Sequence, residues 1–293
     1  MSIAYSVLVT GTFMAGLGGL LALLLAVASK RLYVFEDPRI EQVEELLPHS
    51  NCGACGTAGC HNFAEQTVAG QIEPARCTVN PPEQNKTIAE LLGVAMGDVE
   101  KRVARLACAG GKHVAKMRAK YAGLSSCRAA ALAGGGGKSC AWGCLGLGDC
   151  ADVCDFGAIT MDSQGLPVVD LAKCTACGDC VDICPKNLFS IQGVSRKLWM
   201  ACRNEIDGDA AEASCEVACT ACGRCVSDAA PGLIRLERNL AVIDYEQNDN
   251  ANRKVIERCP TGAIVWLEGD RISKGKAAKK IIRIEPLPFT AEA

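Results

Sequence analysis

The sequence predicts an α+β protein that begins with one membrane-spanning helix, and three observations carry this prediction. The first 29 residues contain no charged side chain. The chain has 20 cysteines among 293 residues, and most of them stand in runs two to five residues apart. These runs recur along the chain, and they end in apolar pairs such as Leu188-Phe189 that indicate short strands. Repeated small domains of helices and short strands are therefore expected after the helix.

One run indicates the cofactor. It reads Cys174-x2-Cys177-x2-Cys180-x3-Cys184-Pro185, which is the spacing of a bacterial ferredoxin. In that arrangement three thiolates hold one [4Fe–4S] cluster and the fourth crosses over to a second cluster. Disulfide-rich scaffolds are short and secreted, and zinc ribbons use two separate C-x2-C pairs without this third cysteine. Iron–sulfur clusters are therefore the expected cofactor.

The anchor is assigned to residues 1–29, and its apolar core is about as long as a bilayer-spanning helix. Lys30 and Arg31 follow directly, so the positive-inside rule predicts an external amino terminus and a cytoplasmic soluble part. A cleaved signal peptide would need a charged start and a shorter apolar core, so we expect an uncleaved anchor. Glycines within residues 16–19 would let a partner helix approach closely in the membrane.

The next segment, residues 30–82, is expected to form a small [4Fe–4S] domain. After an amphipathic stretch it presents a C-x2-C-x4-C-x16-C pattern with glycines that let the backbone approach sulfur. Its expected ligands are Cys52, Cys55, Cys60 and Cys77. Asn80-Pro81-Pro82 then predicts a boundary, and residues 83–133 are expected to be a helical linker region.

Residues 134–198 are expected to form a ferredoxin-like domain with two clusters. Its first half departs from the ferredoxin pattern, since Leu147 replaces the middle cysteine and Asp155 replaces the proline. Cys140 can supply the missing thiolate. The crossover rule then predicts two ligand sets, Cys140, Cys144, Cys150 and Cys184, and Cys154, Cys174, Cys177 and Cys180.

Residues 199–293 are expected to form a degenerate ferredoxin-like domain with one cluster, followed by a basic tail. Ferredoxin spacing counted through this segment places the ligands of the second cluster at Ala229, Asp249, Asn252 and Val255, none of which can bind iron as a thiolate. The other ligand set is complete, namely Cys219, Cys222, Cys225 and Cys259.

Four cysteines remain, and their role stays open between a fifth cluster and buried apolar thiols. They are Cys108, Cys127, Cys202 and Cys215, and the separation Cys127-x12-Cys140-x3-Cys144 recurs as Cys202-x12-Cys215-x3-Cys219. Four or five [4Fe–4S] clusters are therefore expected.

Other kinds of site are not expected. The net charge of -2 gives no reason to expect a nucleic-acid partner. The run Gly137-Lys138-Ser139 ends like a phosphate-binding loop, but Leu132 stands where that motif needs glycine. No G-x-G-x-x-G follows a plausible strand, so no dinucleotide site is expected. The histidines, His49, His61 and His113, are expected to be surface or neighbouring groups, and no catalytic residue is predicted.

The anchor, the four-cysteine domain and the strings Gly-Cys144-Leu-Gly-Leu-Gly-Asp-Cys150 and Lys173-Cys174-Thr-Ala-Cys177-Gly together resemble the B subunit of the Rnf complex. That complex is an ion-translocating ferredoxin:NAD oxidoreductase of bacterial membranes. The resemblance covers nearly the whole chain. It implies an electron-transfer subunit in the inner membrane that accepts electrons from soluble ferredoxin, works with integral and peripheral partner subunits, and has no complete active site of its own. The resemblance also implies that NAD and flavin lie on other subunits and not on this chain.

Two other functions stay open from the residues alone. An iron–sulfur redox sensor, or a reductase limb that keeps a regulator reduced, would need few clusters and one exposed, labile cluster. A corrinoid-type iron–sulfur protein has a similar first domain, but the anchor and the ferredoxin repeats count against it.

Overall fold

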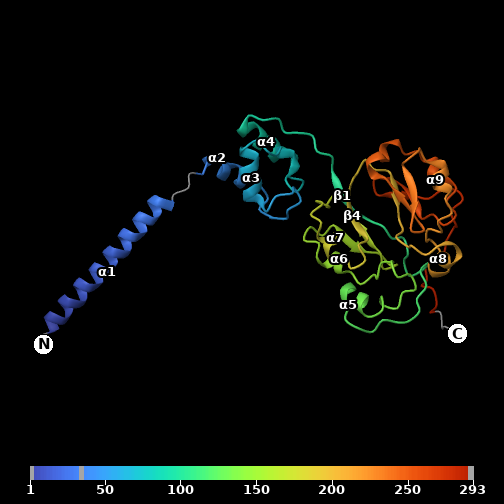
Figure 1. Ribbon diagram of the computed structural model, residues 1–293, viewed down its shortest axis with the longest axis horizontal. Helices are drawn as coiled ribbons and strands as arrows, with labels where there is room; N and C mark the ends of the chain where they lie inside the picture. Colours follow the sequence, from blue (N-terminus) through green and yellow to red (C-terminus); the bar gives the residue numbers. More distant parts are fainter. Residues whose placement is uncertain (1–2, 33–35, 290–293) are drawn as a thin grey trace.

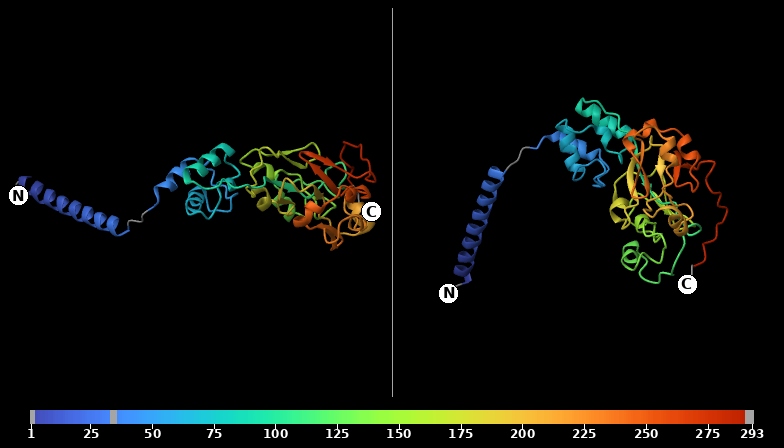
Figure 2. Two further views of the ribbon diagram at one scale, coloured as in Figure 1. Left: turned by 90° about the horizontal axis from the view of Figure 1, so that it is seen from above. Right: turned by 45° about the vertical axis from the view of Figure 1, so that its right-hand side comes forward.

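The computed structural model describes residues 3–32 and 36–289. An anchor helix stands apart from the rest of the molecule, a small helical domain follows, and two units of short helices and strands lie side by side (Figure 1). The two views of Figure 2 show the same order. The α+β class and the single apolar amino-terminal helix predicted from the sequence are confirmed for the described residues.

Helix α1 spans Ile3–Leu32, so it ends three residues later than the predicted anchor. The segment Val7–Leu32 has a mean hydropathy of 2.0, and none of its apolar surface is buried within the chain. The only charged residues of the helix are Lys30 and Arg31 in its last turn. A helix this apolar and this exposed is suited to lipid rather than to water.

The first domain consists of α2 (Pro38–Glu45), α3 (Cys60–Val68), the 3-10 turn η1 (Pro74–Arg76) and α4 (Pro82–Leu92). The carboxylate of Asp37 caps α2 by accepting the N–H of Arg39 at 2.9 Å. The core is formed by fully buried Val43, Phe63 and Ile88, one from each α-helix. His61 contacts Glu44 at 2.6 Å and thereby ties α3 to α2 at the surface.

The expected helical linker at residues 83–133 differs from the structure. Helix α4 packs into the first domain, and residues 102–106 form a strand of the next unit rather than a helix. Pro81 and Pro82 stand at the start of α4 and do not mark a domain boundary, because proline is well suited to the first turn of a helix.

This assignment of α4 predicts the effect of Ile88→Ala. Because Ile88 is 0% exposed, its truncation should lower the free energy of unfolding of the first domain by about 2–5 kcal/mol. The matched control is Leu91→Ala in the same helix, where the side chain is 42% exposed and a change within about 0.5 kcal/mol is expected. Hydrogen exchange of the α2 and α3 amides measures both. If Ile88→Ala and Leu91→Ala changed the free energy of unfolding equally, α4 would be a linker and not part of the core of the first domain.

The first ferredoxin-like unit contains two antiparallel pairs of strands. Strand β1 (Arg102–Leu106) pairs with β4 (Phe189–Gly193), and β2 (Ile159–Met161) pairs with β3 (Pro167–Val169). Short helices α6 (Asp149–Asp152) and α7 (Asp179–Ile183) contact each other, and α5 (Cys127–Leu132) lies apart from the strands. The buried residues between these elements include Ala104, Ile159 and Phe189.

The second unit repeats this plan with different strand pairing. Strands β5 (Leu198–Met200), β8 (Ile264–Glu268) and β9 (Arg271–Ser273) form a sheet, and β6 (Ile234–Glu237) pairs with β7 (Leu240–Ile243). Its helical elements are α8 (Gly208–Ser214), α9 (Arg224–Asp228), η2 (Tyr245–Asn250) and α10 (Lys254–Glu257). Val255 is 1% exposed and belongs to the hydrophobic core against which Ala229 packs. Apolar side chains therefore pack around Ala229 and Val255, two of the four positions where a second cluster of this unit would need cysteine.

The two units are joined by backbone hydrogen bonds. The N–H of Lys116 donates to the Ser214 carbonyl at 3.1 Å, and the N–H of Glu216 donates to the Val114 carbonyl at 3.0 Å. A third bond joins Ala109 N–H to the Ala201 carbonyl at 3.0 Å. These bonds bring residues near 109, 115, 201 and 215 together.

The carboxyl-terminal segment also spans both units. Residues 274–289 leave the second unit, where Lys279 pairs with Glu212 at 3.0 Å. Further on, Arg283 pairs with Glu216 at 2.6 Å, and Leu287 N–H donates to the Lys112 carbonyl at 2.9 Å. The segment is thus fixed along the protein by both its backbone and its charges.

Candidate iron–sulfur sites

The thiols of the first domain line one cavity, which we call site 1. The space between its lining atoms, counted together with the part open to solvent as for the thiol sites below, is about 300 Å³, and it lies between the α2–α3 core and the loop that follows η1. Its cysteines are Cys52, Cys55, Cys60 and Cys77. The side chain of Asn51 accepts the N–H of Cys60 at 2.8 Å, and a Cβ on Gly59 would lie 2.8 Å from that same oxygen. Glycine is therefore needed at position 59 to bring this loop close to α3.

Site 2 lies in the first ferredoxin-like unit. A cavity of about 330 Å³ is lined by Cys154, Cys174, Cys177 and Cys180, the set that the crossover rule predicts. The N–H of Ala158 donates to Cys154 Sγ at 3.3 Å, and the N–H of Ala104 donates to Cys174 Sγ at 3.4 Å. Burial raises the pKa of Cys180 to about 12, and the neighbouring thiols add to the rise.

Site 4 lies in the second unit, where Cys219, Cys222, Cys225 and Cys259 line a cavity of about 340 Å³. Burial raises the pKa of Cys225 to about 12, with further contributions from the other three thiols. Cys222 is exposed, whereas Cys219 and Cys225 are buried. This cavity therefore opens towards solvent on the side of Cys222.

Site 3 differs from the set that the sequence groups together. Burial raises the pKa of Cys150 to about 12, and the next contributions come from Cys127 and Cys184. Cys150 in turn contributes to the raised pKa of Cys144. Cys140, which the sequence places here, is not among the main contributors to either value. Cys127 and Cys184 thus lie near Cys150, while Cys144 lies between Cys150 and Cys108, whose Sγ accepts its N–H at 3.4 Å.

Cys140 instead meets three of the four remaining cysteines. A space of about 310 Å³ between the two units is lined by Cys108, Cys140, Cys202 and Cys215, which we call the junction set. Three of these thiols are less than one-tenth exposed. The four cysteines left over in the sequence therefore do not form one group. Cys127 lies beside Cys150, apart from Cys108, Cys202 and Cys215.

The position of Cys127 has a local cause. The carboxylate of Asp149 accepts the N–H of Cys127 at 2.8 Å and the Ser126 hydroxyl at 3.0 Å, so it caps helix α5 from a neighbouring helix. Partial burial opposes ionisation of Asp149, but these hydrogen bonds outweigh it and lower its pKa. Because Asp149 immediately precedes Cys150, this cap brings Cys127 beside Cys150.

Sequence reasoning also missed the role of Lys138. Its ammonium is buried and donates to the carbonyls of Gly110 and Cys144 at 2.6 Å each. Lys138 lines the junction cavity and opposes the effect of burial on the pKa of Cys140 and of Cys215. In the sequence, only the glycine run before Lys138 draws attention to this residue. The fold is what brings its side chain to the thiols.

The donor sets fit iron–sulfur clusters better than single ions. Among residues 3–32 and 36–289, no group of three or more His, Cys, Asp or Glu side chains is arranged to hold one metal ion. In a [4Fe–4S] cluster each thiolate binds a different iron, so the sulfurs surround a cavity instead of meeting at one point. Burial of uncharged thiols also disfavours thiolates, and bound iron compensates for this cost.

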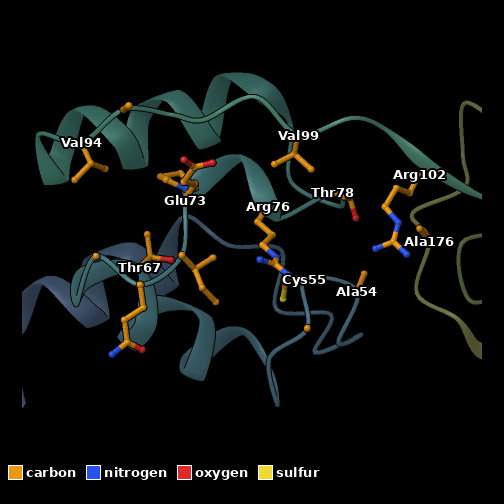
Figure 3. Close-up of a pocket in the computed structure, with 16 residues that line it drawn as sticks. Ala54, Cys55, Thr67, Glu73, Arg76, Thr78, Val94, Val99, Arg102 and Ala176 are labelled. Carbon is orange, nitrogen blue, oxygen red and sulfur yellow. The ribbon is translucent and has the colours of Figure 1, made fainter. Parts of the chain in front are cut away.

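Sites 1 and 2 face each other across an open cleft. Figure 3 shows Arg76 above Cys55 on one side and Arg102 near Ala176 on the other. Beside this cleft the hydroxyl of Thr78 donates to the carbonyl of Thr175 at 2.7 Å. Each threonine follows a cysteine of its site, so the two sites approach one another closely.

Comparison with known proteins agrees with these sites. A family model for an Fe-S cluster matches residues 47–79, and one for a 4Fe-4S dicluster domain matches residues 139–188. The chain is 38% identical to the B subunit of the Na(+)-translocating ferredoxin:NAD(+) oxidoreductase complex of Acetobacterium woodii, over 88% of this chain and 76% of that protein. It is 38% identical to the B subunit of the ion-translocating oxidoreductase complex of Methanosarcina acetivorans, over 86% of this chain and 95% of the relative.

A third relative is the B subunit of the proton-translocating ferredoxin:NAD(+) oxidoreductase complex of Clostridium ljungdahlii, 36% identical over 85% of this chain and 88% of that protein. Each of these similarities covers 85–88% of this chain. The chain therefore belongs to the family of B subunits of ion-translocating Rnf oxidoreductase complexes, and it is an iron–sulfur protein of electron transport.

Proposed function

We propose that this chain passes electrons from reduced soluble ferredoxin to membrane partners of a ferredoxin:NAD type complex. [4Fe–4S] clusters bound by its cysteines would supply the one-electron transfer. We further propose that NAD and flavin bind other subunits of the complex. The chain itself would hold the thiols, donate N–H groups to their sulfurs and keep water out.

The observation that carries this proposal is the continuity of the thiol sites. Site 1 adjoins site 2 through the Thr78–Thr175 hydrogen bond. Site 2 adjoins site 3, because α7, which contains Cys180, contacts α6, which contains Cys150. A protein that only senses a redox change needs one such site, whereas a series of neighbouring sites suits conduction.

The proposal is tested with membranes that contain the complex. Addition of reduced ferredoxin should give rapid oxidation of ferredoxin, and membranes without this chain should lose that activity until the chain is restored. Anaerobically purified chain should contain about sixteen to twenty iron atoms. Eight or fewer iron atoms, or zinc in place of iron, would contradict the proposal. Ferredoxin oxidation that does not depend on the chain would favour a sensor.

We also propose that the soluble part lies on the cytoplasmic face of the bacterial inner membrane, since Lys30 and Arg31 end α1. An impermeant thiol reagent applied to intact cells should then leave all the cysteines unlabelled. The same reagent applied to inverted vesicles after iron removal should label them. Labelling from outside the cell would reverse this orientation.

A further inference from the structure

The junction set brings together cysteines from both ferredoxin-like units. Cys108 follows β1 and Cys140 precedes α6 in the first unit, whereas Cys202 follows β5 and Cys215 follows α8 in the second. The shared cavity has about 20 Å³ of space open to the centre of a water molecule, against about 10, 20 and 20 Å³ at sites 1, 2 and 4. The junction thus has the dimensions of the other four-thiol cavities.

Hydrogen bonds to the sulfurs are repeated between the units. Cys108 Sγ accepts the N–H of Gly110 at 3.4 Å and that of Cys144 at 3.4 Å. Cys202 Sγ accepts the N–H of Asn204 at 3.4 Å and that of Cys219 at 3.3 Å. In each unit one donor lies two residues after the accepting cysteine, and the other lies four residues after the second junction cysteine. The two halves of the cavity are therefore built in the same way.

Two sulfurs of the junction set lie close to Gly110. A Cβ on Gly110 would lie 3.1 Å from Cys215 Sγ and 3.6 Å from Cys108 Sγ, so these two sulfurs from different units face the same point. The apolar remainder of the lining includes Ala201, Val217 and Ala218.

We propose that Cys108, Cys140, Cys202 and Cys215 bind a fifth [4Fe–4S] cluster between the two units, with the buried ammonium of Lys138 beside it. This inference rests on the proposed function. It also assigns Cys127 to site 3 with Cys144, Cys150 and Cys184. The junction would then join site 3 to site 4, since Cys144 and Cys219 each belong to one of those sites and donate an N–H to a junction sulfur.

Lys138 has a separate role in this proposal. Its charge is held in the cavity wall by the carbonyls of Gly110 and Cys144, the same residues whose N–H groups donate to Cys108. A fixed positive charge favours the more negative, reduced state of a bound cluster and so raises its reduction potential.

Paired substitutions test the ligand set. The full-length chain is purified anaerobically with alanine at Cys127, Cys140 or Cys202, and in the pairs C140A/C202A and C127A/C202A. Each single change should remove about four iron atoms. Cys140 and Cys202 would bind the same cluster, so C140A/C202A should also remove only about four iron atoms. Cys127 and Cys202 would bind different clusters, so C127A/C202A should remove about eight. Paramagnetic resonance should show one missing signal in the first pair and two in the second.

Each other outcome has a definite meaning. Loss of about eight iron atoms in C140A/C202A and about four in C127A/C202A would overturn the ligand set in favour of Cys108, Cys127, Cys202 and Cys215. Unchanged iron in C202A, with about sixteen in the wild type, would overturn the fifth cluster and leave the proposed function intact. Eight or fewer iron atoms in the wild type would overturn both.

Lys138→Met gives a readout that does not require removing a ligand. The aliphatic stem is kept and the charge is lost, so iron content should stay the same while one midpoint potential becomes more negative. The matched control is Lys112→Met, which removes an exposed ammonium close in sequence to Gly110 and should shift no potential. Unchanged potentials in Lys138→Met would overturn the role of Lys138, even if the alanine variants fail to fold.

Discussion

Cys184→Ala is expected to remove about four iron atoms while site 2 keeps its own. Cys184 ends α7, whose other cysteine, Cys180, belongs to site 2, so one short helix serves two sites. Loss of the Cys184 thiolate leaves site 3 with three ligands. All four thiols of site 2 remain in place around their cavity.

Ferredoxin oxidation by membranes that carry Cys184→Ala should fall at least about tenfold, because loss of a direct ligand should exceed the 10–100-fold effect of removing an outer hydrogen-bond partner. The variant should still bind ferredoxin. Asp182→Asn is the matched control, since it changes an exposed residue of the same helix and should leave both iron content and rate unchanged. An unaltered rate in Cys184→Ala, with the cluster shown to be absent, would falsify conduction through site 3.

Removal of iron is expected to unfold both ferredoxin-like units. Their helices are short, with α6 having four residues and α7 and α9 five each, so they gain little stability from their own hydrogen bonds. The thiols of both units surround cavities instead of packing against each other. Metal binding is therefore coupled to folding here.

The measurement is near-ultraviolet circular dichroism and limited proteolysis before and after anaerobic chelation, with the full chain in detergent. The signal of Trp199, which packs on Tyr245 with ring centroids 5.1 Å apart, should be lost. Helix α1 should stay protected by detergent. Unchanged protection of residues 102–289 after complete iron loss would show that the apolar cores alone hold these units together.

The uncharged apolar run at the amino terminus predicted the anchor. Local cysteine spacing predicted three of the thiol groupings. At sites 1, 2 and 4, three ligands stand within a few residues of each other, so the loop geometry itself brings them together. The crossover of Cys154 to site 2 followed from the ferredoxin repeat. The lining of that cavity agrees with this grouping.

Spacing grouped Cys140 with Cys144 and Cys150, whereas the structure places Cys140 in the junction cavity and Cys127 beside Asp149, next to Cys150. Both precede the same run, and the choice depends on Asp149 capping α5 from a neighbouring helix. The junction depends on pairing between residues near 115 and 215, which no local pattern specifies. The helix expected at residues 102–106 is a strand because β4, far along the chain, is its partner.

The path of residues 274–289 has a consequence for the order of biosynthesis. These residues are synthesised after both ferredoxin-like units, and they contact Lys112 in the first unit and Glu216 in the second. The thiols of site 1 lie within residues 52–77, and the helices that pack around them end at residue 92, so the first domain can fold before either unit has been synthesised. The contacts of residues 274–289 can form only after both units are present, so the relative position of the two units is fixed later than the fold of the first domain.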